Sequence, residues 1–216
     1  MDILTLAYTD LRYPPALKMY LNDDAPASIF ALGDLGILKG KTLALFSSVK
    51  CPGNLILRTY DLAQKLRSRG VAVIGGFHSP MERETLAILL RGKQPVVICP
   101  ARDIGPKMAH KYAELLEQRR LLILSPFNAN QSRITAETSV ARNCFVAALA
   151  DAVFVAYAEP RGKMEQLCHR VLAWKKPLCT LESNANAHLI ALRAKTVNAD
   201  TQFDLLLENI FCEPKQ

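Results

Sequence analysis

The sequence lacks the features that mark membrane-spanning, secreted and metal-binding proteins. None of its apolar runs reaches the roughly 20 residues that a transmembrane helix needs, and its first residues lack the basic and apolar regions of a signal peptide. No two cysteines form a C-x-x-C pair. The cysteines are scattered at Cys51, Cys99, Cys144, Cys168, Cys179 and Cys212. We therefore expect a soluble cytoplasmic protein with reduced cysteines, no metal site and no membrane partner.

Signatures of nucleotide binding and of catalysis are also missing. The sequence contains no G-x-G-x-x-G, no complete G-x-x-x-x-G-K-[ST] P-loop and no G-x-S-x-G. Cys168 and His169 are adjacent in a helical pattern, so their side chains diverge and do not form a catalytic dyad. We expect no cofactor and no catalytic residue, and a non-enzymatic role is favoured without being settled.

The composition allows a well-packed domain with a positive charge. Half of the 216 residues are apolar and 22% are charged, with a formal net charge of +7. Without a long polar tract, this composition indicates one globular α/β domain rather than disorder. The excess of Lys and Arg is compatible with a polyanionic partner but does not identify one.

Residues 42–76 show the pattern on which the fold prediction depends. Two short apolar runs, 42–46 and 71–74, flank an amphipathic stretch of helical length, which predicts a β-α-β unit. Further apolar runs at 95–99, 121–124, 152–156 and 177–181 alternate with helical patterns at 80–91, 106–119, 138–150 and 164–174. This alternation predicts a Rossmann-like α/β/α fold in three layers, with a mostly parallel sheet covered by helices on both faces.

The first 40 residues differ from the rest. Pro14, Pro15 and Pro26 interrupt them, and they suggest a short helix near 14–21 and an extended piece at 28–32. We predict that residues 1–40 form a lead-in packed on a main domain of residues 41–216. Two short helical patterns, near 185–194 and 201–210, close the chain.

Three loops that follow predicted strands are candidates for a binding site. Ligands of open parallel sheets bind outside the carboxyl ends of the strands, and helix N-termini there favour anions. The loops are residues 47–54, 75–80 and 159–163, and a cation from the helix at 138–150 can join them. The candidate residues for binding phosphate or nucleic acid are Ser47, Ser48, Lys50, Gly75, Gly76, His78, Arg142, Asn143, Arg161, Gly162 and Lys163.

Each of these residues also has a purely structural interpretation. Gly75 and Gly76 can serve only a tight turn, and His78 can be an ordinary surface residue. Arg142 can cap a helix or pair with Glu137 or Asp151. Glu82 and Glu84 can act as acid or base, or can simply complement a helix N-terminus.

Several stretches in series resemble the DNA-processing protein A (DprA, also Smf) family. The "R-N-R-I-I-A-G-L-S-D-A-V" motif of that family is the most specific match, at residues 141–153 (ARNCFVAALADAV). The other matches are residues 13–17 (YPPAL), 25–33 (APASIFALG), 73–77 (VIGGF) and 124–126 (LSP). The loops at 47–54 and 159–163 occupy the places of the "G-S-R" and "S-G-[ST]" signatures of the family.

The resemblance implies a function as well as a fold. It implies single-stranded DNA binding in a basic pocket, a homodimer, and handover of DNA to a RecA-type recombinase in natural transformation. The chain departs from the pattern at several cations: Phe46 and Ser48 replace the Gly and Arg of "G-S-R", and Cys144 replaces the second Arg of "R-N-R". It also ends without the winged helix of the family, so we expect a divergent member.

Three functional hypotheses follow. The first is a sequence-independent single-stranded DNA binder in which Phe77 or His78 stacks on a base. The second is a sensor or hydrolase for a nucleotide or another phosphate-containing small molecule, resembling the LOG phosphoribohydrolases. The third is a degenerate relative that acts through protein contacts alone.

Overall fold

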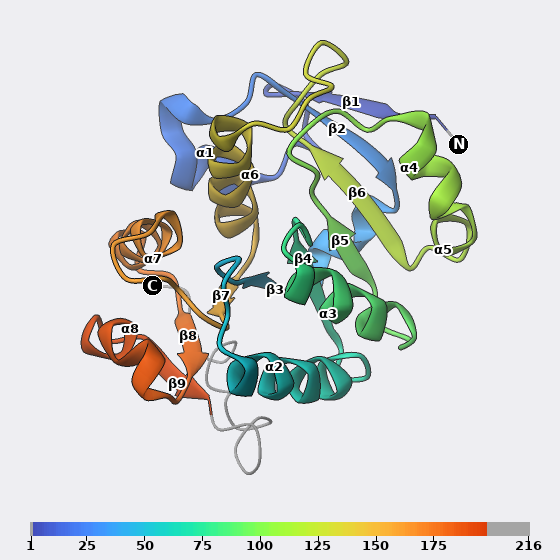
Figure 1. Ribbon diagram of the computed structural model, residues 1–216. Helices are drawn as coiled ribbons and strands as arrows, with labels where there is room; N and C mark the ends of the chain where they lie inside the picture. The colour runs from blue at the N-terminus through green and yellow to red at the C-terminus, as the bar shows by residue number, and fades with distance from the viewer. Residues whose placement is uncertain (1, 198–216) are drawn as a thin grey trace.

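A nine-stranded sheet forms the centre of the computed structural model, which describes residues 2–197 (Figure 1). Its strand order is β1-β2-β6-β5-β4-β3-β7-β8-β9, and the strands from β6 to β9 are mutually parallel. The strands are β1 (Leu4–Ala7), β2 (Ser28–Gly33), β3 (Lys41–Phe46), β4 (Val71–Gly75), β5 (Val96–Ile98), β6 (Leu121–Ser125), β7 (Ala152–Val155), β8 (Leu178–Leu181) and β9 (Lys195–Val197). The predicted Rossmann-like, mostly parallel sheet is therefore confirmed.

Helices cover both faces of this sheet. The α-helices are α1 (Pro15–Leu21), α2 (Gly53–Leu66), α3 (Pro80–Leu90), α4 (Pro106–Lys111), α5 (Ala113–Glu117), α6 (Ala136–Leu149), α7 (Lys163–Ala173) and α8 (Ala187–Ala191), with 3-10 turns η1 (Asn22–Asp24), η2 (Leu35–Lys39) and η3 (Asn184–Asn186). Helices α1, α6 and α7 pack in one apolar cluster, and α2, α3 and α5 pack in the other, across the sheet.

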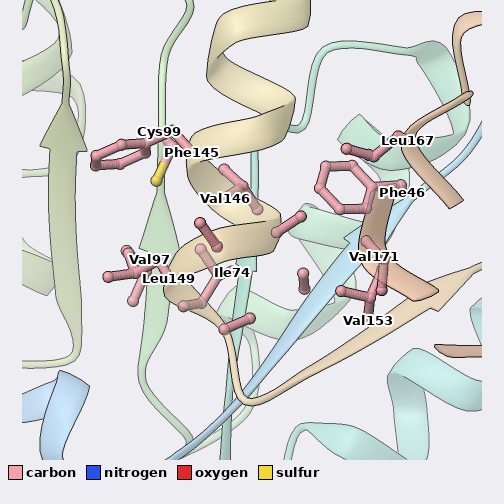
Figure 2. Close-up of a cluster of buried hydrophobic side chains, with 14 of the residues drawn as sticks. Phe46, Ile74, Val97, Cys99, Phe145, Val146, Leu149, Val153, Leu167 and Val171 are labelled. Carbon is pink, nitrogen blue, oxygen red and sulfur yellow. The ribbon is translucent and has the colours of Figure 1, made fainter. Parts of the chain in front are cut away.

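The core under α6 and α7 shows how the strand pattern fixes the layers. Phe46 of β3, Ile74 of β4 and Val153 of β7 belong to the same buried cluster as Phe145 and Val146 of α6, and Phe46 lies beside Leu167 of α7 (Figure 2). Alternate residues of these strands point to the opposite face and contact α2 and α3. Because helices cover both faces of the sheet, these strands appear in the sequence as continuous apolar runs.

The lead-in is more closely joined to the domain than the sequence indicated. β2 pairs antiparallel with β6, and β1 pairs antiparallel with β2, so residues 4–33 extend the sheet itself. The four-residue β1 and the three-residue β9 were not predicted because runs so short leave no period to detect. The helix expected at 106–119 divides into α4 and α5 at Tyr112. The pattern at 201–210 lies outside the described residues.

We searched residues 2–197 of the structure for membrane-spanning helices and for clusters of metal-binding side chains. No helix in that range is long and apolar enough to cross a membrane. In the same range, no three His, Cys, Asp or Glu side chains gather in a way that could hold a metal ion. The cysteines described there are free thiols: Cys51, Cys99, Cys144, Cys168 and Cys179.

A buried lysine closes the carboxyl end of α6. The Nζ of Lys176 donates to the carbonyl oxygens of Ala147, Ala148 and Ala150 at 2.9, 2.5 and 2.5 Å. It also lies 4.0 Å from the ring centroid of Tyr20. Burial lowers the pKa of Lys176 to about 7, whereas its three acceptors favour the charged ammonium. The last carbonyls of a helix have no intrahelical partner, and Lys176 supplies one for this helix.

We expect Lys176→Met to lower the free energy of unfolding by about 2–3 kcal/mol, because it leaves buried carbonyl oxygens without a donor. Urea denaturation followed by circular dichroism measures the change. The matched control is Lys175→Met, which removes the same charge from an exposed neighbour and should change stability by less than about 0.5 kcal/mol. Equal effects of the two substitutions would show that Lys176 has no capping role.

Candidate anion-binding site

The strand order places a topological switch point between β3 and β7. β4, β5 and β6 follow on one side of β3, whereas β7 pairs with β3 on its other side. The helix after β3, α2, packs on one face of the sheet, and the helix after β7, α7, packs on the other. The loops after these two strands therefore separate toward opposite faces, which is the geometry at which open α/β sheets bind ligands.

The two loops at this point are joined by hydrogen bonds. The amide of Ser48 donates to the carbonyl oxygen of Tyr157 at 2.8 Å, and the amide of Glu159 donates to Oγ of Ser48 at 2.8 Å. The amide of Ala156 donates to the carbonyl oxygen of Phe46 at 2.9 Å. The predicted convergence of loops 47–54 and 159–163 is thus present, and Ser48 is the residue that connects them.

Exposed cations and uncapped helix ends lie at these loops. Lys50, Arg161 and Lys163 are exposed. No side chain caps α2, which begins at Gly53, or α7, which begins at Lys163. In the first turn of α2, the amide of Leu55 already donates to the carbonyl oxygen of Pro52 at 3.0 Å, so the candidate donors of this helix are the amides of Gly53 and Asn54. The dipoles of both helices favour an anion near their first amides.

Residues 159–162 form a tight turn before α7. Arg161 has a φ of +59°, and its amide donates to the Glu165 carboxylate. The amide of Gly162 donates to the carbonyl oxygen of Glu159 at 2.9 Å. A Cβ on Gly162 would lie 2.9 Å from that oxygen, so the turn itself requires this glycine. Two carboxylates, of Glu159 and Glu165, thus accompany the cations of this loop.

The loop after β4, residues 75–80, already binds a carboxylate of the protein itself. Glu82, buried near the start of α3, accepts from the amide of Ser47 at 3.0 Å through Oε1. Its Oε2 accepts from the amides of His78 and Ser79 at 2.8 and 3.1 Å. The Oγ of Ser79 in turn accepts from the Glu82 amide, which completes a capping box. These amides of Ser47 and loop 75–80 are therefore not free for a phosphate, contrary to the expectation for that loop.

Arg142 is a buried structural residue in this conformation. It is 5% exposed, and its Nη1 donates to the carbonyl oxygen of Cys99 at 3.1 Å. Its Nε donates to Oδ1 of Asn143 at 2.8 Å. Burial lowers the pKa of Arg142, and the negative charge of Glu82 opposes that shift. Neither of the carboxylates considered from the sequence, at positions 137 and 151, pairs with Arg142.

Gly76 is required by the position of that arginine. A Cβ at Gly76 would lie 1.3 Å from Nη1 of Arg142, so the guanidinium occupies the space of a missing side chain. Gly75 is in contact with the ring of Phe77, which is 6% exposed. Phe77 is therefore not available for stacking on a base, whereas His78 is exposed.

A cavity of about 660 Å³ lies next to the candidate site. Its walls come from the lead-in, the loop after β6 and helices α6 and α7, with Lys163 among them. Arg170, another wall residue, is paired with Asp24 at 2.8 Å. The sequence did not indicate this cavity because its walls come from segments far apart in the chain. The lining residues are Leu21, Asp24, Pro26, Pro126, Phe127, Ala136, Glu137, Val140, Ala141, Cys144, Phe145, Lys163 and Arg170.

The fold and these loops define a doubly wound α/β protein with a candidate anion-binding site at its switch point. The chain belongs to the DNA recombination-mediator protein A family, whose model matches residues 4–209. It is 31% identical over 152 residues to the protein Smf of Borreliella burgdorferi, across 68% of this chain and 46% of the relative. The chain thus spans about half the length of that curated relative.

Solved structures of the same family share the fold. The DNA processing protein A of Streptococcus pneumoniae is similar with a TM-score of 0.78 and 21% identity, over 96% of this chain and 75% of that one. The DNA processing protein A of Helicobacter pylori is similar with a TM-score of 0.77 and 21% identity, over 97% and 98%. The latter structure concerns a single-stranded DNA-binding mode of the H. pylori protein. The resemblance seen in the sequence is therefore confirmed.

We expect Glu82→Gln to lower the free energy of unfolding by about 3 kcal/mol, because it removes the charge opposite buried Arg142 and places an amide group against backbone donors. Thermal and urea unfolding measure this loss. Glu84→Gln changes an exposed carboxylate on the same helix and serves as the control, with an expected effect below about 0.5 kcal/mol. A Glu82 variant as stable as the control would refute this structural role.

Proposed function

We propose that the chain binds single-stranded DNA without sequence preference at the carboxyl edge of the sheet, between the loops after β3 and β7. The observation that carries the proposal is the hydrogen-bonded junction of Ser48 with Tyr157 and Glu159, which brings two cation-bearing loops together. Family membership and the single-stranded DNA-binding mode of the H. pylori relative support it.

In this proposal, contacts with the phosphate backbone of the single-stranded DNA supply the binding energy. Lys50, Arg161 and Lys163 contact successive phosphates, and the first amides of α2 and α7 donate to phosphate oxygens. His78, the exposed aromatic side chain of the second loop, stacks on a base. Arg142 holds the loops from beneath and does not touch the ligand.

A small phosphate-containing ligand, such as a nucleotide, is the second candidate. The specific observation that favours it is the cavity of about 660 Å³, which has largely apolar walls and Lys163 at its border. Such a volume suits a nucleotide-sized molecule. Its base would lie against the apolar walls, and its phosphate would lie near Lys163.

The first test removes three cations of the candidate site together, as Lys50→Ala, Arg161→Ala and Lys163→Ala, called here the rim variant. We expect affinity for a single-stranded oligonucleotide to fall about tenfold or more, because each lost phosphate contact removes counterion release. The slope of log affinity against log salt should fall by about 2, at roughly 0.7 per phosphate on a single strand. Fluorescence anisotropy at several salt concentrations measures both.

The matched control removes three exposed cations from the opposite edge of the sheet, as Arg91→Ala, Lys93→Ala and Arg119→Ala. This edge variant has the same net charge and should keep its single-strand affinity within about twofold. The proposal is rejected if the wild-type chain does not bind the oligonucleotide at low salt. A thermal shift with nucleoside monophosphates, without oligonucleotide binding, would instead select the small-ligand function.

Family membership also supports proposals about location and partners. We propose a cytoplasmic homodimer that delivers single-stranded DNA to a RecA-type recombinase during DNA uptake and recombination. Sedimentation should give twice the 23.9 kDa mass of the chain. Loading of the recombinase onto single-stranded DNA should be faster with the chain than without it. A monomer at every concentration, or no effect on loading, would remove the corresponding proposal.

A further inference from the structure

A larger group of cations than the one at the candidate site lies at the amino edge of the sheet. Residues 67–70, 91–95 and 118–120 lead directly into β4, β5 and β6. These loops contain six cationic side chains and no carboxylate. We call this set the amino-edge cluster: Arg67, Arg69, Arg91, Lys93, Arg119 and Arg120. By comparison, loops 47–54 and 159–163 together carry three cations and one carboxylate.

The sheet brings these three loops side by side. β4, β5 and β6 are neighbouring parallel strands, so they begin at the same edge, at intervals of about 4.8 Å. The amide of Lys93 donates to the carbonyl oxygen of Arg67 at 3.1 Å, and the amide of Val96 donates to that of Arg120 at 2.9 Å. The cluster is therefore one continuous surface.

This surface is also held rigidly. Nη2 of Arg120 donates to the carbonyl oxygens of Leu90, at 3.1 Å, and Gly92. A Cβ at Gly92 would lie 2.3 Å from Cβ of Arg67, so the α2–β4 and α3–β5 loops are in close contact there. Arg120 thus ties the α5–β6 loop to the end of α3 and to the α3–β5 loop.

Four cations of the cluster face solvent, and one of them, Arg69, also has a contact of its own. The other three are Arg91, Lys93 and Arg119. Within residues 2–197, the ion pairs of the structure involve Arg12 and Arg170 and none of these three side chains. Cations near helix C-termini complement the helix dipole, but that effect does not require every charge in three adjacent loops to be positive. The exposed like charges of Arg91, Lys93 and Arg119 on one edge attract a polyanion.

The composition of the cluster identifies the kind of polyanion. Five of its six members are arginines, whose planar guanidinium groups bind phosphate oxygens in pairs. The three loops contain no aromatic residue on which an unpaired base could stack. We propose that the amino-edge cluster binds the phosphate backbone of duplex DNA without sequence preference, as a second nucleic-acid site on the opposite edge from the single-strand site.

The test compares the edge variant, Arg91→Ala with Lys93→Ala and Arg119→Ala, with the rim variant that has the same net charge. Fluorescence anisotropy is measured with a duplex and with a single strand between about 50 and 200 mM salt, over which phosphate contacts lose most of their strength. For the duplex, we expect the edge variant to lose about tenfold in affinity and about 2.7 in salt slope, at 0.9 per phosphate contact.

The rim variant and the single strand distinguish this site from the one proposed above. The edge variant should retain single-strand binding within about twofold, and the rim variant should retain duplex binding likewise. If the rim variant loses single-strand binding alone, this result supports the single-strand site of the proposed function and leaves the duplex site to be decided by the edge variant. Equal loss of duplex binding in both variants, no duplex binding by the wild-type chain, or an edge-dependent response to phosphatidylserine vesicles but not to duplex would overturn the second site. Circular dichroism of both variants confirms that they are folded.

Discussion

The buried carboxylate of Glu82 is the interaction on which the carboxyl edge of the sheet depends. One side chain accepts amides from the loop after β3 and from the loop after β4, and its charge faces buried Arg142 of α6. Three segments that are distant in the chain are thereby fixed around one ionised group. A buried charge is strongly destabilising once one of its partners is removed, so the geometry of the two loops and the position of α6 depend on one another.

The same arrangement changes what the edge can offer to a ligand. A conventional anion site presents empty backbone amides, but here the chain places its own carboxylate against the amides of Ser47, His78 and Ser79. The donors that remain belong to α2 and α7. These two helices follow β3 and β7, the pair of strands at which the order of the sheet reverses.

Much of the fold could be predicted because it depends on local patterns. The buried runs of β3, β4 and β6, and the helices between them, are visible in the sequence since their apolar positions repeat with strand and helix periods. The convergence of loops 47–54 and 159–163 could also be predicted, since carboxyl ends of parallel strands share an edge. The burial of Arg142 could not, because it depends on how α6 crosses Gly76. Likewise, the cationic loops before β4, β5 and β6 are plain in the sequence, but their union requires the strand order.

The antiparallel pairing of β2 with β6 has a consequence for how the chain forms during synthesis. Phe30 pairs with Ser125, so the ribosome must add about 95 further residues after β2 before its partner strand exists. Contacts of such long sequence separation form slowly because the loop between them must close first. The amino-terminal segment can therefore join the sheet only after β6 exists, although it is the first to emerge, and until then the apolar residues of β2 lack their partner strand.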